Sequence, residues 1–437
     1  MVVMSAPTQA NRPVVKRLAN GLTVIAEQMS TAAVNLDIWL RVGSRVESDA
    51  INGMAHFLEH MIYKGTPRLK CGEFERLIEE RGAITNAATS QDYTHYYITT
   101  APQDFAQLAP LQVELLLNAN LQDKDFERER PVILEEIRRA EDNPRRRVFQ
   151  RSMALNIQEL PYRRTVLGPS SVIEHLSAEQ MRAFHQRWYQ PQNMTAVVVG
   201  DLPVEELIAI IEAGFDQAMA NRHLEDAAVA GETVPVTEPE APFTTISRAD
   251  YTDSALQQAR LVLSWRVPGM RQLSETYALD IVASILGHGR TARLVQDLRE
   301  HRSLVNSISA SNITFDEQGV FYISANLTTD QLEASEAAIL EHIQHLHHQP
   351  VTAAELDRVR TQVANRHVFG NETSSERASM YGYYHALTGN VENALDYPQV
   401  IRSIDSAAVQ QAVQQYLSVS AYGVLRLRPE TASPALH

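Results

Sequence analysis

The sequence is poor in cysteine: Cys71 is the only one among 437 residues. An intrachain disulfide is therefore excluded, and so is a metal site built from several cysteine thiolates. A chain without disulfides suits a reducing compartment, in which thiols are not oxidised.

Long apolar runs are also missing, and crossing a bilayer as a helix takes about 18 or more consecutive apolar residues. The first residues, MVVMSAPTQANRPVVKRLANG, show no basic segment followed by an apolar core of the secretory type. We therefore expect a cytoplasmic protein that does not bind membranes.

Basic residues are outnumbered: 39 Lys and Arg face 53 Asp and Glu, which gives a formal net charge of -14. Nucleic-acid backbones and anionic lipid surfaces would be repelled by this charge, so neither is expected as a partner. Hydrophobic residues make up 44% of the chain, which is typical of a folded globular protein rather than a disordered one.

The length fits two domains, each able to bury its own core. Residues 219–246 contain Pro235, Pro239 and Pro242 among small and acidic residues, a composition that resists both helix and sheet. We place the interdomain linker there. The expected domains are then residues 12–218 and 247–432.

The two halves resemble each other. LDIWLRV at 36–42 corresponds to LVLSWRV at 261–267, and a helical pattern follows each. Near the end of each half, a helical pattern is followed by a strand pattern. The first such stretch begins at residue 177 and the second at residue 406. Two corresponding pairs of segments in the same order indicate that the two halves arose by duplication. The expected fold is α+β, with a mainly antiparallel sheet packed against helices in each domain.

A cluster of ionisable residues lies in the apolar stretch GMAHFLEHMIYKGT of the first half only. On a helix, His56 and His60 lie one turn apart on the same face, with Glu59 beside them. Two imidazoles can hold a zinc ion, and a carboxylate beside them can take a proton from water. This is the H-x-x-E-H arrangement of some zinc peptidases. The alternative is a partly buried polar helix face without a metal.

A third ligand is needed, and the segment ERERPVILEEIRRAED from residue 127 offers carboxylates. Glu129 and Glu136 lie two helical turns apart on one face, whereas Glu135 would point elsewhere. One of the two can bind the metal while the other orients it. If the helix begins only near Pro131, Glu129 lies outside it.

Residues 53–66, NAATSQDYTHY (86–96) and ERPVILEEI (129–137) together resemble the pitrilysin or insulinase family of inverzincin metallopeptidases. The length and two-domain plan are similar to its mitochondrial-processing-peptidase-like branch. The resemblance implies a clamshell of two domains, with Zn²⁺ held by His56, His60 and Glu136. It also implies Glu59 as the general base and a supporting role for Glu129.

The resemblance further implies that peptides bind by strand addition, with Asn86 and Ala87 pairing with the substrate. It implies an arginine and a tyrosine, seven residues apart, that bind substrate from a catalytically silent second domain. Arg377 and Tyr384 have this spacing, and Tyr381 and Tyr383 are alternatives for the tyrosine.

Since one chain holds both the zinc motif and this pair, the resemblance implies a homodimer that cleaves unstructured peptides inside a chamber. A heterodimer with a related inactive subunit and a noncatalytic core-type subunit are the alternatives. The acidic residues that bind a substrate arginine in the mitochondrial enzymes are replaced here by Arg146 and Gln150, so presequence-type arginine specificity is not expected from these two positions. Other acids could substitute for them.

Overall fold

The computed structural model describes residues 12–222 and 237–430, which form two compact units. Unit 1 takes its described residues from 1–137, 164–235 and 369–394, and unit 2 from 138–163, 236–368 and 395–437. Most of the expected linker, residues 223–236, lies outside the described part.

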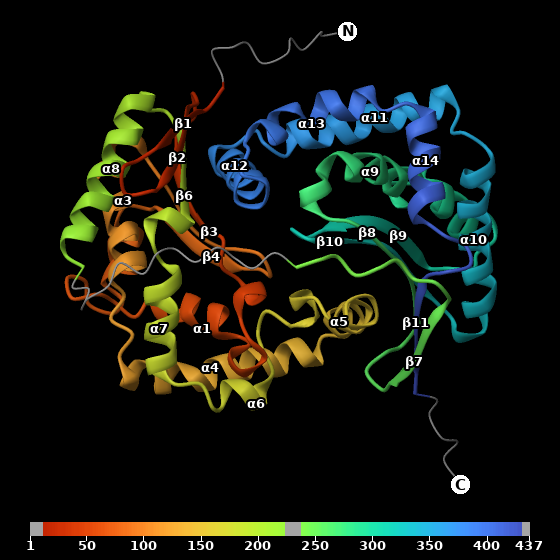
Figure 1. Ribbon diagram of the computed structural model, residues 1–437, viewed down its shortest axis with the longest axis horizontal. Helices are drawn as coiled ribbons and strands as arrows, with labels where there is room; N and C mark the ends of the chain where they lie inside the picture. Colours follow the sequence, from red (N-terminus) through yellow and green to blue (C-terminus); the bar gives the residue numbers. More distant parts are fainter. Residues whose placement is uncertain (1–11, 223–236, 431–437) are drawn as a thin grey trace. The chain divides into compact units, whose positions relative to one another are not determined.

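Unit 1 is built on a six-stranded sheet in the order β1-β2-β6-β3-β5-β4 (Figure 1). Its strands are β1 (Val14–Arg17), β2 (Thr23–Gln28), β3 (Val34–Leu40), β4 (Ile84–Thr89), β5 (Thr94–Thr100) and β6 (Met194–Gly200). Its helices are α1 (Met54–Ile62), α2 (Glu73–Glu80), α3 (Pro102–Asn118), α4 (Asp123–Asp142, whose last turn is counted with unit 2), α6 (Ser170–Ile173), α7 (Ala178–Trp188), α8 (Val204–Ala220) and α12 (Ser374–Thr388).

Unit 2 is built on a five-stranded sheet in the order β7-β11-β8-β10-β9. Its strands are β7 (Ser247–Asp253), β8 (Ala259–Pro268), β9 (Ser307–Thr314), β10 (Gln318–Leu327) and β11 (Gly423–Pro429). Its helices are α5 (Pro144–Asn156), α9 (Leu273–Gly287), α10 (Leu332–His348), α11 (Ala353–Phe369), α13 (Glu392–Ser403) and α14 (Ser406–Tyr416).

The two sheets have the same connectivity. In unit 1, β2 runs parallel to β6, and the remaining pairs β6-β3, β3-β5 and β5-β4 are antiparallel. In unit 2, β7 runs parallel to β11, and β11-β8, β8-β10 and β10-β9 are antiparallel. The expected α+β fold with two similar, mainly antiparallel domains is confirmed, and β1 is the one addition in unit 1.

The units depart from the expected domain boundaries by exchanging one helix each. Helix α5 lies before the linker in sequence but packs on β8 and β11 of unit 2, whereas α12 lies after it and packs on β3 and β6 of unit 1. The expected boundaries at residues 218 and 247 therefore assign each of these two helices to the wrong unit. A helix's partner is fixed by long-range contacts, which sequence periodicity does not contain.

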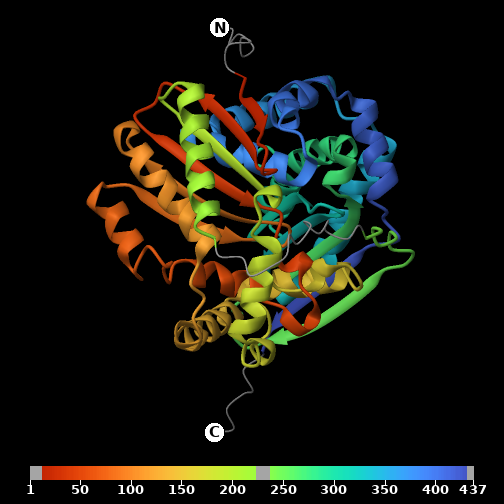
Figure 2. The same ribbon diagram turned by 60° about the vertical axis from the view of Figure 1, so that its left-hand side comes forward.

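Both faces of the unit 1 sheet are covered, so β3 and β6 are buried at every position. On one face, Leu36 and Ile38 of β3 join the main apolar core with α1, α3, α7 and α8. Figures 1 and 2 both show α3 and α8 along this face. The intervening side chains of β3, including Asp37 and Trp39, face α12 on the other side.

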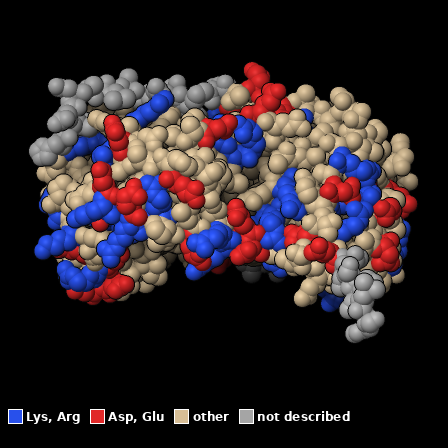
Figure 3. All heavy atoms as spheres, turned by 90° about the horizontal axis from the view of Figure 1, so that it is seen from below, with Lys and Arg blue, Asp and Glu red and all other residues tan. Residues whose placement is uncertain are grey.

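Among the described residues, no helix has the length and apolar character needed to cross a membrane. Figure 3 shows acidic and basic side chains interspersed on the face in view rather than gathered into one area of single sign.

Candidate active site

Helix α1 is fixed at its N-terminus by a buried carboxylate. Glu47 accepts hydrogen bonds from the Ala55 N–H (2.7 Å), the Gly53 N–H (2.8 Å) and the Asn52 side-chain amide (2.8 Å). Burial raises the pKa of Glu47 to about 7, against the lowering effect of these donors. Gly53 has a φ of 99°, a conformation that glycine adopts readily. The start of α1, and with it the direction of His56, is set by this contact.

Three potential ligand atoms converge beside α1. His56 Nε2 lies 3.3 Å and His60 Nε2 lies 3.6 Å from Glu136 Oε2, which projects from α4. One ligand atom from each of these residues lies within 4.8 Å of the others. The i, i+4 spacing on α1 and the position of Glu136 therefore produce the expected set.

The donor set and its spacing fit a zinc ion. Bonds of about 2.0–2.1 Å in a tetrahedral arrangement place ligand atoms about 3.3 Å apart. The distances from Glu136 Oε2 to the two imidazole Nε2 atoms, 3.3 and 3.6 Å, lie near this value. Two histidines and one carboxylate leave a fourth position for water or substrate, as in catalytic rather than structural zinc sites.

The ring of His60 is oriented by a further carboxylate. Glu129 Oε1 lies 3.1 Å from His60 Nδ1, and Lys64 Nζ lies 2.6 Å from Glu129 Oε2. The bond to His60 is the main cause that lowers the pKa of Glu129, so Glu129 is a carboxylate at neutral pH. An Nδ1 proton donated to Glu129 leaves the Nε2 lone pair of His60 for a metal.

The helix does not begin at Pro131, because α4 runs continuously from Asp123 to Asp142. Proline removes one backbone donor but can be accommodated within a long helix that is packed on one side. Glu129 therefore lies inside the helix and reaches His60. Glu135, one residue before Glu136, is not among the three converging residues.

Glu59 lies on α1 between the two histidines. Its carboxylate accepts a short hydrogen bond from the Thr89 hydroxyl, at the last residue of β4. Because β4 lies beside α1, the end of this strand fixes the side chain that we expect to act as the general base.

Strand β4 is the terminal strand of the unit 1 sheet and pairs with β5. Asn86 is exposed, whereas Ala87 is partly buried and packs against the main core. An edge strand presents unpaired backbone groups that another strand can bond. The two residues thus lie where an added strand would pair, although their role stays a prediction.

Arg377 and Tyr384 lie on α12, on the face of the sheet opposite α1. The Arg377 guanidinium donates to Glu27 Oε1 of β2 (2.9 Å), and the Tyr381 hydroxyl donates to Glu27 Oε2 (2.8 Å). The structure thus brings His56, His60, Glu136, Glu129 and Glu59 together but places this pair elsewhere in the same unit.

Sequence reasoning missed three supporting residues: Glu47, Lys64 and Thr89. Lys64 lies in the turn just after α1, four residues beyond His60, so its nearness in sequence was a usable signal. The contacts of Glu47 with Gly53 and of Thr89 with Glu59 depend on how a loop and a strand end meet α1. No local pattern in the sequence indicates either contact.

Two family models match the chain. The model described as insulinase (peptidase family M16) matches residues 22–170, and the model described as the peptidase M16 inactive domain matches residues 175–363. The first match contains the converging residues, and the second covers most of the half without them. The second match begins at residue 175, which lies before the expected linker at 219–246.

Curated relatives match over nearly the whole chain. Zinc protease PqqE of Helicobacter pylori is 25% identical over 416 residues, which cover 94% of this chain and 92% of that protein. A probable mitochondrial-processing peptidase subunit beta of Arabidopsis thaliana is 26% identical over 445 residues, covering 98% and 81%.

Solved structures share the fold. A protease from Helicobacter pylori superposes with a TM-score of 0.88 at 25% identity, covering 96% of this chain and all of that one. Pitrilysin superposes with a TM-score of 0.78 at 19% identity, covering 98% of this chain and 46% of pitrilysin.

Proposed function

Because the chain belongs to the M16 family of peptidases, we propose that it is a zinc endopeptidase that hydrolyses unstructured peptides. His56, His60 and Glu136 would hold the zinc ion, and Glu59 would act as the general base. The convergence of these three ligand atoms beside Glu59 is the observation that carries the proposal.

The proposed chemistry divides between the metal and the chain. Zinc bound by two imidazoles and a carboxylate supplies Lewis acidity that activates water and polarises a carbonyl. Glu59 takes the proton from the attacking water and returns it to the leaving amine. The Thr89 hydroxyl holds one oxygen of Glu59, which directs the carboxylate before substrate arrives.

The surrounding residues act by positioning. Glu129 and Lys64 hold His60, and Glu47 fixes the first turn of α1, on which His56 lies. A displacement of about 1 Å in such a site can lower a rate about 100-fold, so these contacts matter although none touches substrate.

We propose that the substrate pairs with the free edge of β4, through the backbone of Asn86 and Ala87. Strand addition uses main-chain hydrogen bonds and therefore requires an extended peptide. Thr89, on the same strand, bonds Glu59, so a peptide on this edge would run past the proposed base. This favours unstructured peptides over folded proteins.

We further propose a cytoplasmic homodimer in which Arg377 and Tyr384 complete the site of the partner subunit within a shared chamber. Within unit 1, the sheet separates α12 from α1, so this pair is not placed to serve the zinc residues of its own unit. Substrate binding by Arg377 would have to compete with its ion pair to Glu27.

The first test measures bound zinc and cleavage of a quenched unstructured peptide for wild type and Glu59→Gln. We expect zinc in both proteins and cleavage by wild type alone, with a loss of about 100-fold or more. Glu79→Gln, an exposed carboxylate on α2, is the control and should keep both properties. Zinc-free wild type, or full cleavage by Glu59→Gln, would refute the proposal.

The second test asks whether subunits share residues. Arg377→Ala and Glu59→Gln proteins, each weakly active alone, should recover activity when mixed if the pair acts across a homodimer. No recovery after confirmed subunit exchange would exclude sharing.

A further inference from the structure

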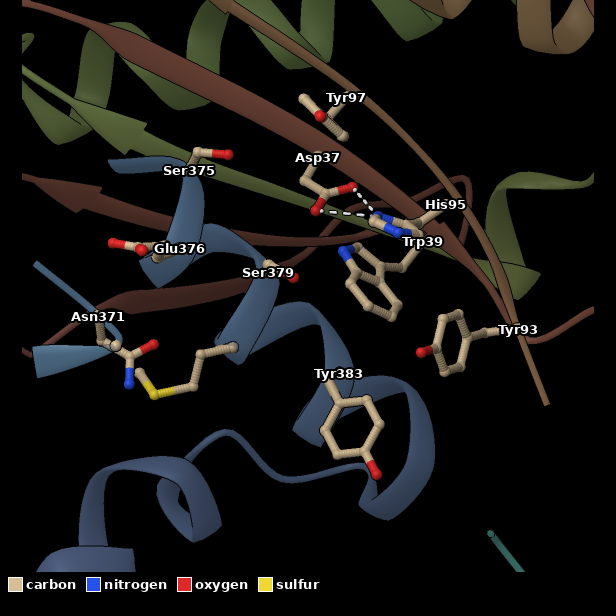
Figure 4. Close-up of a pocket in the computed structure, with 12 residues that line it drawn as sticks. Asp37, Trp39, Tyr93, His95, Tyr97, Asn371, Ser375, Glu376, Ser379 and Tyr383 are labelled. Carbon is tan, nitrogen blue, oxygen red and sulfur yellow. Dashed lines mark hydrogen bonds and ion pairs between the residues drawn. The ribbon is translucent and has the colours of Figure 1, made fainter. Parts of the chain in front are cut away.

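A pocket of about 510 Å³ lies in unit 1 between α12 and the sheet face away from α1 (Figure 4). Strands β3 and β5 and the turn before β5 contribute its floor, and the start of α12 contributes its wall. The lining residues used below are Asp37, Trp39, Tyr93, His95, Tyr97 and Tyr383. None of them belongs to the proposed zinc site.

Aromatic rings dominate the pocket. Trp39 stacks on His95 with ring centroids 4.3 Å apart, and Tyr93 lies 4.7 Å from Trp39. Tyr383 meets Tyr93 edge to face at 6.0 Å. Helix α12 approaches this closely because residue 382 is glycine: a Cβ there would lie 2.1 Å from Trp39 Nε1. Ring faces attract cations.

A buried acid and a histidine form the polar part of the pocket. Both oxygens of Asp37 lie near His95 Nδ1, at 2.9 and 3.2 Å. Burial raises the pKa of Asp37, and the interaction with His95 opposes the rise. When Asp37 is ionised it accepts the Nδ1 proton of His95, and in the neutral ring this leaves Nε2 as a hydrogen-bond acceptor.

The charge of the lining is negative. Asp37 and Glu376 line the pocket, and none of the described residues that line it is a lysine or an arginine. The Glu376 carboxylate also accepts from the Thr373 N–H and hydroxyl at the start of α12. The nearby Arg377 is directed to Glu27 and to the Asn371 carbonyl. A positively charged group would therefore meet the rings of Tyr93 and His95, with the buried carboxylate of Asp37 directly behind His95.

The fold itself does not require these polar residues. In the aligned repeat of unit 2, Asp37 corresponds to Val262 and Trp39 to Ser264. Val262 is fully buried in an apolar cluster under α5. An acid at position 37 thus departs from what packing alone would select, which points to a ligand.

The pocket lies next to the strand on which substrate is proposed to pair. His95 and Tyr97 of β5 oppose Ala88 and Asn86 of β4, both of which are exposed. A peptide added to β4 would lie about 10 Å from β5, two strand spacings away. Every second side chain of that peptide would face the α12 side, with only the small Ala88 between it and His95.

We propose that this pocket binds an ammonium or guanidinium group of the peptide that pairs with β4. The flexible stem of a lysine or arginine side chain carries its charge far enough to cross Ala88. The inference rests on the proposed peptidase function, but the cation site can be measured without it.

The first measurement is binding of N-acetyl-arginine amide and its neutral isostere N-acetyl-citrulline amide to the full chain, followed calorimetrically with and without zinc. We expect arginine amide to bind in both conditions and at least about tenfold more tightly than citrulline amide. Asp37→Asn should abolish this difference, whereas Asp280→Asn, a buried aspartate of unit 2, should leave it unchanged. Equal binding of the two amides by wild type would overturn the proposal.

The second measurement compares kcat/KM for peptides in which arginine or citrulline occupies each position in turn. Wild type should prefer arginine at one position about tenfold, and Ala88→Phe should remove that preference while free arginine amide still binds. If Asp37→Asn does not fold, Tyr93→Leu tests the aromatic wall instead. Unchanged preference in these variants would overturn the proposal.

Two further comparisons show which positively charged group of the peptide is bound, and whether a negative result refutes the cation site or the peptidase function. N-terminal acetylation should not alter the preference if a side chain is bound, whereas loss of it on acetylation would assign the pocket to the peptide's amino terminus. Selective arginine amide binding by a chain that cleaves no peptide would refute the peptidase function and still support the cation site.

Discussion

The two sheets have the same strand order but differ on the face covered by the exchanged helix. In unit 2, Val148 of α5 packs with Val262 and Leu425 in an apolar cluster. In unit 1, the corresponding face carries the Arg377–Glu27 ion pair and the Asp37–His95 pair. The architecture therefore accepts either an apolar or a polar layer at this place.

The other face of each sheet, covered by α1 in unit 1 and by α9 in unit 2, also carries polar residues in unit 1 and apolar residues in unit 2. Helix α1 carries His56, Glu59 and His60, whereas the corresponding α9 buries mainly aliphatic side chains. Buried charge is unfavourable unless it is paired, so the polar residues of unit 1 lower stability relative to apolar packing. Such residues are expected where a site needs them, and the fold itself does not dictate the chemistry.

The largest effect on zinc binding and cleavage is expected when a histidine of α1 is replaced, in contrast to a histidine at the end of α9. His60→Ala removes a proposed ligand, so we expect loss of cleavage and a zinc affinity lowered by more than the roughly 10–100-fold typical of a supporting residue. His288→Ala, at the end of α9, should retain both zinc and cleavage. Zinc content and peptide hydrolysis measure the contrast, and equal losses in both variants would remove the distinction between the helices.

Placing an acid in the apolar cluster of unit 2 tests the difference between the sheet faces covered by α5 and by α12. Val262→Asp would bury an unpaired carboxylate in an apolar cluster and should lower the free energy of unfolding by about 3–5 kcal/mol. Val368→Asp, at a position 37% exposed, should change it by about 0.5 kcal/mol or less. Urea denaturation gives both values, and similar values would show that the cluster tolerates charge.

Unit 2 contains a buried acid of its own, which gives a pH prediction. Burial raises the pKa of Asp280 to about 6, although Asn312 and Tyr397 donate to it. The folded chain then binds a proton more tightly than the unfolded chain. Its contribution to stability is complete below about pH 4 and is lost as pH rises through 6, by about 3 kcal/mol in all.

Asp280→Asn should remove this pH dependence. The difference between wild-type and variant unfolding free energies, measured by urea denaturation from pH 4 to 8, should change in that window. Asp357→Asn, an exposed residue of α11, is the control. A constant difference would place the pKa of Asp280 near its ordinary value.

The smallest effect concerns the support of His60. Glu129→Gln should weaken zinc binding by about 10–100-fold, because an amide orients the ring less strongly than a carboxylate. Glu127→Gln, on an exposed turn of the same helix and paired with Arg130, should bind zinc as wild type does. Competition with a metal indicator gives both affinities, and an unchanged Glu129→Gln affinity would assign Glu129 a purely structural role.

Much of the candidate active site was predictable from spacing. The separation of His56 and His60 places both on one helix face, and the two helical turns between Glu129 and Glu136 do the same on α4. These are local relationships that survive in any structure in which the helices form. The resemblance to known peptidases then selected Glu136 over Glu129 as the third ligand, and the structure places Glu136 beside both histidines.

What the structure alone decided are contacts between distant segments. Arg377 and Glu27 are 350 positions apart, and no periodicity predicts that α12 crosses to the first sheet. The pocket beneath α12 follows from that crossing, since its walls come from both ends of the sequence. The sequence by itself indicated the duplication, most of the elements and the pairing of His56 with His60 on one helix face, because each depends on local spacing. The tertiary structure decided which sheet each exchanged helix covers, because long-range packing is a property of the whole chain.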